Sequence, residues 1–188
     1  MNQSPHSTTG IDLVNRIGQF ACLVPLNFFV LGALSATAAS AELNRLNPPA
    51  TDQIPVAFLI SDGAVVIDFT GPWEVFQDVT IPSSQNMPFR LYTAAETTKP
   101  IRTSGGMQIV PDYTIANAPA PKVIVIPAQS EPSEAVLGWI RKSSKTTDVT
   151  MSVCTGAFVL SKTGLLDGKS ATTYHGAFAR FATKFPNI

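Results

Sequence analysis

The residue whose type and position best suit chemistry is Cys154, which lies between an apolar run at 148–153 and a helical pattern at 155–164. A sharp turn from strand to helix presents its side chain above a sheet, as in a nucleophile elbow. The start of a helix favours a thiolate over a thiol. The backbone N–H groups of Thr155 and Gly156 are expected to stabilise a developing oxyanion. The alternative is a buried structural cysteine, because free cysteines are often buried.

Two blocks of the sequence resemble one known family. The block SVCTGAFVLSKTGLLDGKSATT around Cys154 resembles the signature of the PfpI/ThiJ family, within the class I glutamine amidotransferase-like superfamily. The block VVIDFTGPWEVF resembles the Asp-Phe-x-Gly-Pro block of its isonitrile hydratase branch and of related N-terminal domains of AraC-type regulators. The resemblance spans roughly residues 55–185.

The resemblance implies roles for three residues. Cys154 matches the family nucleophile, Thr155 matches the residue that follows it, and Asp68 matches the acidic partner of the thiol in the hydratase branch. A carboxyl group at such a place is chemically suited to act as general acid and base on a small substrate. The simpler interpretation of Asp68 is a cap for the helix that follows it, and both interpretations can hold for one residue.

The sequence departs from the family pattern at two places. Many relatives have Gly-Gly after the proline of the central strand, where backbone amides help to form the oxyanion site, but here Pro127 is followed by Ala128 and Gln129. We therefore expect either an oxyanion site of different shape, since φ > 0 is costly there, or a Gln129 side chain that reaches the pocket. Relatives often carry His where Tyr174 stands. His175 is one place later and would face the other side of a strand, so we interpret it as a surface or cap residue unless the strand ends early.

Short apolar runs separated by helical patterns predict βαβ units and a parallel sheet. The expected fold is α/β: a doubly wound, mostly parallel sheet with helices on both faces, in a flavodoxin-like three-layer sandwich. Such a sheet usually adds a strand after a helix like the last one here, so we expect the sequence to be truncated at its C-terminus. The predicted strands are 55–60, 89–95, 107–111, 122–127, 148–153 and 170–174. The predicted helices are 72–79 with Thr70 or Gly71 near its cap, 131–145 with Ser130 or Ser133 as cap, 155–164, and 176–185.

The N-terminal region has the pattern of a secretory signal. Arg16 precedes the apolar run 20–39, and Ala39, Ser40 and Ala41 form a small-x-small cleavage site. We predict an N-terminal extension and signal peptide at 1–41, a linker at 42–54 and one α/β domain at 55–188. The expected location is periplasmic or secreted, with no stable membrane association after cleavage. An uncleaved signal anchor is the lesser alternative.

Composition narrows the classes of function. The chain has 13 Lys and Arg against 13 Asp and Glu, without the basic stripe that nucleic acid binding requires. Besides Cys22 and His6, which precede the predicted cleavage site, the chain contains one Cys and one His, so we expect neither a metal site nor a cofactor. No histidine follows His175, which argues against the Cys-His-Glu triad of an amidotransferase.

The resemblance implies a cysteine-dependent hydratase or hydrolase of a small molecule. For an isonitrile, the Cys154 thiolate would attack the terminal carbon, Asp68 would protonate it, and water would complete an N-formamide. Because few charged residues lie near Cys154 in the sequence, we expect a small neutral substrate. The alternatives are a ligand-sensing domain related to AraC-type regulators and a redox or stress protein in which Cys154 is oxidised. A homodimer is a further possibility that the resemblance raises.

Overall fold

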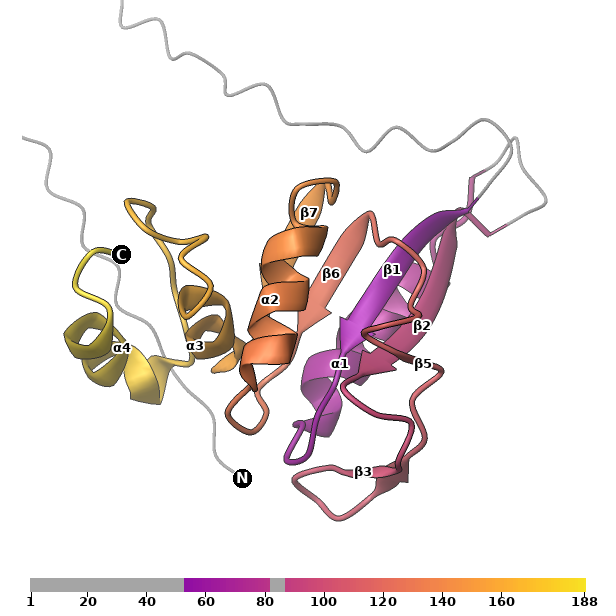
Figure 1. Cartoon of the computed structure of the whole chain (residues 1–188), viewed down its shortest axis with the longest axis horizontal. Coiled ribbons are helices and arrows are strands. Elements are labelled where there is room, and N and C mark those ends of the chain that lie inside the picture. The colour runs from indigo at the N-terminus through magenta and orange to yellow at the C-terminus, as the bar shows by residue number, and fades with distance from the viewer. Residues whose placement is uncertain (1–52, 82–86) are drawn as a thin grey trace, which may run out of the picture. The chain divides into compact units, whose positions relative to one another are not determined.

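Parallel strands form the central sheet in the computed structural model, which describes residues 53–81 and 87–188. The order of its strands is β5-β2-β1-β6-β7, and every neighbouring pair is parallel (Figure 1). Strand order reverses between β1 and β6, as in a doubly wound fold. The predicted fold is thereby confirmed. The strands are β1 (Ile54–Leu59), β2 (Phe89–Ala95), β5 (Tyr113–Thr114), β6 (Val123–Ile126) and β7 (Val149–Ser152).

The two central strands are apolar on both faces, which explains why their sequences read as continuous hydrophobic runs. In β1, Val56 and Phe58 belong to one core cluster and Leu59 to another. In β6, Val125 and Ile126 divide between the same two clusters. Successive side chains of a strand point to opposite faces, so each strand contributes to a core above and a core below the sheet.

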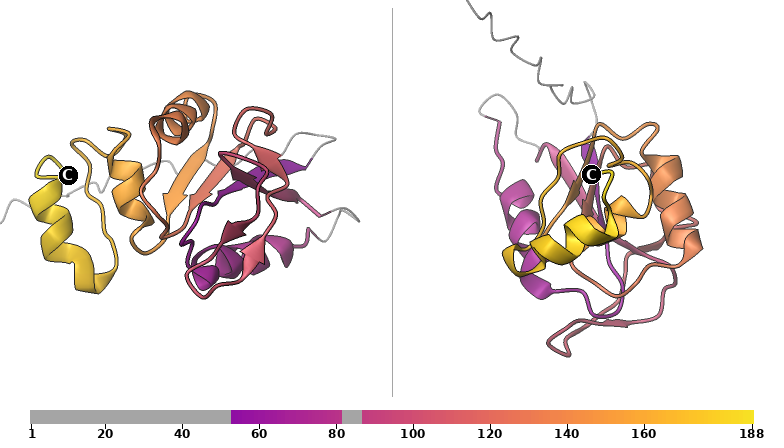
Figure 2. Two further views of the ribbon diagram at one scale, coloured as in Figure 1. Left: turned by 60° about the horizontal axis from the view of Figure 1, so that its bottom comes forward. Right: turned by 90° about the vertical axis from the view of Figure 1, so that its left-hand side faces the viewer.

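Helices cover both faces and complete three layers. Figure 2 shows α1 (Val66–Gln77) on one side of the sheet and α2 (Glu134–Ser143) on the other. On the first side, the ring of Trp73 lies 4.9 Å from that of Phe58. On the second side, Val136 and Ile140 of α2 pack with α3 (Gly156–Ser161). Ser133 caps α2, because its hydroxyl accepts a hydrogen bond from the N–H of Val136 at 3.3 Å.

The first helix begins earlier than predicted. The helix starts at Val66, so the prediction of a cap at Thr70 or Gly71 is wrong, and Pro72 lies inside the helix. Proline usually occupies the first turn of a helix, which is why the sequence favoured the later start. Asp68 consequently lies in the first turn and is not a cap. Its position there turns its carboxyl group toward the protein interior.

The predicted strand at 170–174 is wrong. This segment is irregular and leads into a short 3-10 helix, η1 (His175–Ala177), and then into α4 (Phe178–Lys184). Its two β-branched threonines favoured a strand on propensity alone, but strand propensity depends on a neighbouring strand to pair with. Thr173 instead directs its hydroxyl to the backbone of Cys154.

The predicted strand at 107–111 is shorter than expected and lies outside the central sheet. It corresponds to β4 (Gln108–Ile109), which pairs antiparallel with β3 (Ile101–Arg102). The turn between them includes Gly106, whose φ of 85° is accessible to glycine without strain. This hairpin follows β2 and leads to β5 at the edge of the sheet.

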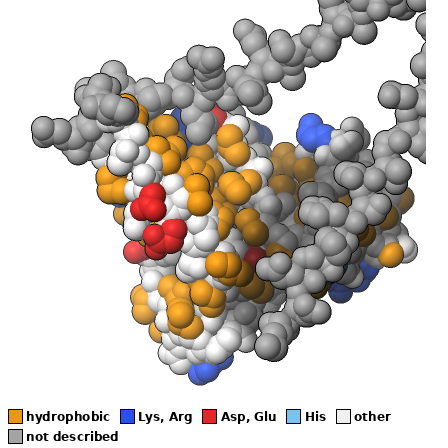
Figure 3. Space-filling model, turned by 180° about the vertical axis from the view of Figure 1, so that it is seen from behind, with side chains coloured by type: hydrophobic (Ala, Val, Ile, Leu, Met, Phe, Trp, Pro, Cys, Tyr) orange, Lys and Arg blue, Asp and Glu red, His pale blue; other side chains and the backbone are white. Residues whose placement is uncertain are grey.

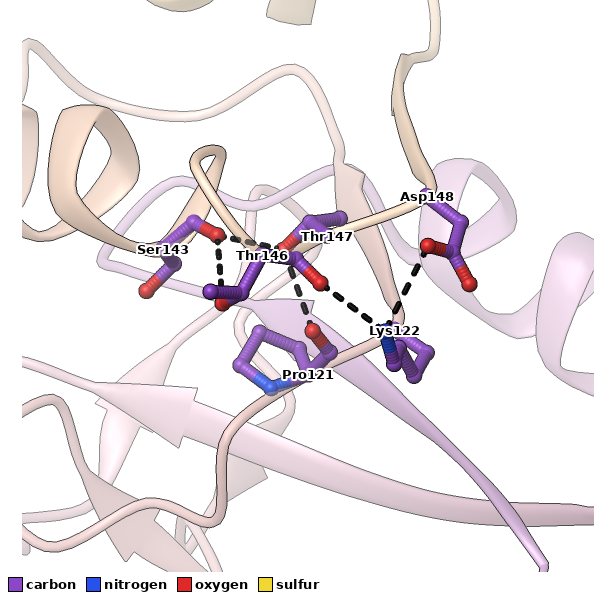
Figure 4. A network of polar contacts seen from close by, with 6 residues as sticks. All are labelled: Pro121, Lys122, Ser143, Thr146, Thr147 and Asp148. Carbon is purple, nitrogen blue, oxygen red and sulfur yellow. Dashed lines mark hydrogen bonds and ion pairs between the residues drawn. The ribbon is translucent and has the colours of Figure 1, made fainter. Parts of the chain in front are cut away.

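A polar network fixes the connection from α2 to β7 at the end of the sheet where β6 begins (Figure 4). The Thr147 hydroxyl contacts the carbonyl oxygens of Ser143 at 2.8 Å and Pro121 at 3.0 Å. Lys122 Nζ donates to the Thr146 carbonyl oxygen at 3.1 Å. These bonds hold the register of β7 against β6, and that register determines where the chain after β7 turns.

The surface of the described residues carries scattered apolar side chains. Ile67 and Val75 on α1 are each 69% exposed, and Figure 3 shows hydrophobic groups with few charges on the face seen from behind. Within residues 53–81 and 87–188, every helix is too short or too polar to cross a bilayer. The predicted signal peptide at 1–41 and most of the linker at 42–54 lie outside the described residues, and the predicted homodimer remains a prediction.

Candidate active site

Cys154 occupies a strained turn at the carboxyl end of β7. Its φ is 55°, and it is the only non-glycine residue with positive φ in the described part of the chain. This left-handed conformation is unfavourable for residues with a Cβ, and it concentrates at functional sites. The side chain is half-buried and its thiol is free. The turn therefore holds a partly accessible thiol between a strand and a helix, as the sequence pattern predicts, but β7 is a partly exposed edge strand and not a buried one.

Three hydrogen bonds hold the turn in place. The N–H of Val153 donates to the carbonyl oxygen of Ile126 at 2.9 Å, and the N–H of Gly156 donates to that of Val153 at 2.9 Å. The Thr173 hydroxyl donates to the carbonyl oxygen of Cys154 at 3.0 Å. Sequence reasoning did not single out Thr173, since a contact between residues nineteen positions apart leaves no local pattern. Its place within the signature block was the only signal.

A close approach between α3 and β6 requires glycine at position 156. A Cβ built there would lie 2.1 Å from the carbonyl oxygen of Ile126 and 2.8 Å from that of Pro127. Real Cβ atoms essentially never approach backbone atoms to under 3.0 Å. Gly156 thus lets the short helix after Cys154 pack directly on the end of the central strand.

Asp68 reaches the same edge of the sheet from α1. Its side chain is buried with 6% exposure, and its Oδ2 accepts a hydrogen bond from the N–H of Ala128 at 3.1 Å. Ala128 follows β6, whose last residue, Ile126, pairs with Ser152, two residues before Cys154. The carboxyl ends of adjacent strands therefore bring Asp68 and Cys154 to one edge, where doubly wound sheets bind ligands.

The backbone amides expected to form an oxyanion site divide into two pairs. Those of Ala128 and Gly156 already have acceptors, Asp68 and Val153. Those of Thr155 and Gln129 have no acceptor among the described residues. Thr155 and Gln129 also line a cavity of about 160 Å³. Any oxyanion bound here would therefore meet the second pair of amides more readily than the first.

The Gln129 side chain spans the base of this region. Its Nε2 donates to the carbonyl oxygen of Leu59 at 3.2 Å, which ties the loop after β6 to the end of β1. Its Oε1 is buried and has no hydrogen-bond partner among the described residues. The substitution of Gln for glycine thus adds a side-chain contact across the point where strand order reverses.

The cavity carries more charge than the sequence suggested. Its lining includes Glu131, Arg180 and Lys184, which are distant from Cys154 in the sequence but adjacent to Thr155 in the fold. The expectation of low charge near Cys154 considered only sequence neighbours, and the cavity that Thr155 lines adds charged side chains which that expectation did not include. The folded chain places charged groups from the loop after β6 and from α4 beside the elbow.

Tyr174 and His175 lie on the surface. Tyr174 is 47% exposed, His175 is also exposed, and their rings lie 4.2 Å apart. The argument that His175 faces away because of strand alternation does not apply, since His175 begins the 3-10 helix. In the described part of the chain, neither side chain has a hydrogen bond to Cys154, and no three His, Cys, Asp or Glu side chains group as metal ligands.

Comparison with known proteins identifies relatives of the whole domain. The model of the DJ-1/PfpI family matches residues 55–184. The chain is 33% identical over 137 residues to the uncharacterized protein in the cpoL 5′ region of Streptomyces lividans, covering 70% of this chain and 95% of that protein. It is 30% identical over 126 residues to the isonitrile hydratase of Pseudomonas putida, covering 64% of this chain and 52% of that enzyme.

A regulator and several solved structures are also similar. The chain is 23% identical over 137 residues to the HTH-type transcriptional regulator GbdR of Pseudomonas aeruginosa, covering 71% of this chain and 37% of the regulator. The chain thus spans about half of the hydratase and less of the regulator. A ThiJ/PfpI family protein from Pseudomonas syringae aligns with a TM-score of 0.55 at 23% identity, covering 73% of this chain and 56% of that one. One from Bacillus anthracis aligns with a TM-score of 0.62 at 15% identity, covering 73% and 66%.

Proposed function

Because this chain belongs to the DJ-1/PfpI family, we propose that it is a cysteine-dependent hydratase or hydrolase of a small molecule, similar in activity to isonitrile hydratase. The observation that carries the proposal is the left-handed backbone of Cys154, with φ of 55°, at the carboxyl end of β7. Strained backbone conformations persist mainly at functional sites, and a nucleophile is the function that suits a half-buried free thiol.

The proposed reaction converts an isonitrile, R–N≡C, and water into an N-formamide. The thiolate of Cys154 forms a C–S bond to the terminal carbon, and that carbon takes a proton from Asp68, which gives the thioimidate R–N=CH–S. A water molecule then adds a hydroxyl group to the same carbon. Its other proton passes through the Asp68 carboxylate to the nitrogen. The new hydroxyl returns a proton to Asp68 as the C–S bond breaks. This step releases R–NH–CHO and regenerates the thiolate.

The geometry suits Asp68 to this double role. Its Oδ2 is held by the N–H of Ala128, and its Oδ1 has no hydrogen-bond partner among the described residues. One oxygen is thus fixed in position while the other is available for proton transfer. Charge that develops on oxygen as the C–S bond breaks would be stabilised by the amides of Thr155 and Gln129, which have no other acceptor in the described part of the chain.

The test is formamide production by the purified full chain from a small isonitrile, measured by mass spectrometry in ¹⁸O water. We expect labelled formamide from the wild type and none from Cys154→Ala. Asp68→Asn should lower kcat by about 10²-fold or more, since general acid–base catalysis contributes that much. Asp148→Asn, which makes the same change on the exposed ion pair with Lys122, is the matched control and should retain activity. Turnover no higher than that of Cys154→Ala would refute the proposal.

A ligand-sensing domain is the second candidate, because the chain is similar to the transcriptional regulator GbdR. A sensor would bind its ligand at the Cys154 edge without consuming it. A small molecule that raises the Tm of the full chain and is recovered unchanged after long incubation would favour sensing over catalysis.

We also propose that the protein is exported, with cleavage after Ala41. The apolar run 20–39 and the small residues at Ala39 and Ala41 support this proposal. N-terminal sequencing of protein recovered outside the cytoplasm should begin at Glu42. Recovery of only the full-length N-terminus would refute it.

A further inference from the structure

A cavity lined by Thr155, the residue after Cys154, has an apolar floor and an exposed, charged rim. Its floor is Phe158 and Val159 of α3, and Arg180 and Lys184 of α4 form part of its rim. Thr155, the residue after Cys154, completes the side toward the elbow. A volume of about 160 Å³ corresponds to roughly five waters at 30 Å³ each, which is enough for a small organic group.

Positive charge at this cavity exceeds negative charge. Glu131 is the acidic residue of the rim, and it pairs with Lys162 and, at 3.8 Å, with Lys184. Arg180 has no ion pair in the described part of the chain, and its guanidinium carbon lies 4.8 Å from the centre of the Phe158 ring. Two lysines therefore share a single carboxylate, and Arg180 has no anionic partner among the described residues.

The crowding of cations has a further consequence. Burial, and then the charge of Lys184, lower the pKa of Lys162 below its usual value. A second anion at the rim would relieve the repulsion among these side chains. A planar guanidinium such as that of Arg180 binds carboxylates in a bidentate geometry.

We infer that this cavity binds a carboxylate carried by the small molecule on which Cys154 acts, with the apolar part of that molecule against Phe158. That the bound molecule is a substrate rests on the proposed function, whereas the binding of a carboxylate in the cavity does not. The carboxylate is held on the α4 side of the elbow, and the reacting carbon faces the thiol. The substrate class is thus a small anionic molecule and not the neutral one expected from the sequence.

Two alkylating agents test the cavity independently of catalysis. Iodoacetate and iodoacetamide react with thiols in the same way, but only iodoacetate carries a carboxylate. The full chain with Cys22→Ser leaves Cys154 as its single thiol. In this background, Arg180→Gln should lower the iodoacetate rate about fivefold or more, since even exposed charge pairs contribute up to about 1 kcal/mol. The iodoacetamide rate should change by less than twofold.

Lys145→Gln is the matched control, since it removes one positive charge from an exposed residue outside the cavity lining. Its ratio of iodoacetate to iodoacetamide rates should stay within twofold of the wild type. An unchanged ratio in Arg180→Gln, or an equal fall in Lys145→Gln, would overturn the inference.

The second arm compares isocyanoacetate with its methyl ester as substrates. We expect kcat/KM to favour the free acid in the wild type, and Arg180→Gln to remove about fivefold or more of that preference. If both substrates turn over and Arg180→Gln leaves their ratio unchanged, the inference is wrong and the proposed function stands. If neither turns over, the proposed function fails, and the alkylation ratio alone decides whether the cavity binds carboxylates.

Discussion

Replacing Cys154 by glycine and by alanine should separate the strain of the elbow from its chemistry. Both variants remove the thiol, so both should lose formamide production and alkylation at this position. They differ in the Cβ, which alanine keeps and glycine lacks. At φ of 55°, the Cβ makes the left-handed backbone unfavourable, and glycine relieves this cost.

The expected difference follows from two opposing effects. A left-handed backbone costs a residue with a Cβ about 1–2 kcal/mol. The greater freedom of glycine in the unfolded chain costs about 0.4–1 kcal/mol. We therefore expect the free energy of unfolding of Cys154→Gly to exceed that of Cys154→Ala by about 0.5–1 kcal/mol.

Urea unfolding followed by tryptophan fluorescence measures this difference, because Trp73 and Trp139 are partly buried on opposite faces of the sheet. Gly138→Ala in α2 is the control, because at this helical position we expect alanine, and not glycine, to give the higher free energy of unfolding. No neighbouring atom would lie within 4 Å of the new Cβ, and alanine should be more stable there by about 1 kcal/mol. If Cys154→Ala proves at least as stable as Cys154→Gly while the control behaves as expected, Cys154 is not held in a left-handed conformation.

Three further perturbations test the surroundings of the elbow and the core. Gly156→Ala should destabilise the protein by about 1–3 kcal/mol or more and alter the alkylation rate of Cys154, because the new Cβ would lie 2.1 Å from the carbonyl oxygen of Ile126. Gly138→Ala serves again as the control, and an unchanged urea midpoint in Gly156→Ala would contradict the close packing of α3 on β6. Thr173→Val should cost about 1 kcal/mol and change Cys154 alkylation, whereas Thr173→Ser should restore both, since its hydroxyl donates to the Cys154 carbonyl oxygen at 3.0 Å. Burial raises the pKa of Tyr92 to about 12 from 10.0, so the unfolded state releases its proton first and stability should fall as pH rises from 10 to 12. Tyr92→Phe should lessen that fall, and an identical pH dependence of urea midpoints in the two proteins would refute the assignment.

Much of the fold could be predicted because its information is local. The strand predicted at 89–95 has the same bounds in the structure, and that at 55–60 is displaced by one residue. Both are apolar runs that parallel sheets bury on both faces. The start of α1 was predicted six residues late because Pro72, a usual marker of a first turn, lies within the helix.

Only the part of the site formed by residues adjacent in sequence could be predicted. The elbow at Cys154 follows from a strand that runs directly into a helix. The contacts that surround it join residues far apart in sequence, such as Asp68 with the amide of Ala128 and Thr173 with the carbonyl of Cys154. The cationic rim was missed for the same reason, since Arg180 and its neighbours reach the elbow only through the packing of α4 beside α3.

The bond between Asp68 and the amide of Ala128 has a consequence for how the sequence can drift over evolution. Every amino acid except proline supplies the same backbone N–H, so a change of the side chain at position 128 does not by itself remove the partner of the carboxyl group. A glycine in a relative and the alanine here are equivalent for this bond. The side chain at 128 can therefore change, within the limits of its buried site, while Asp68 keeps the anchor that fixes its carboxyl group.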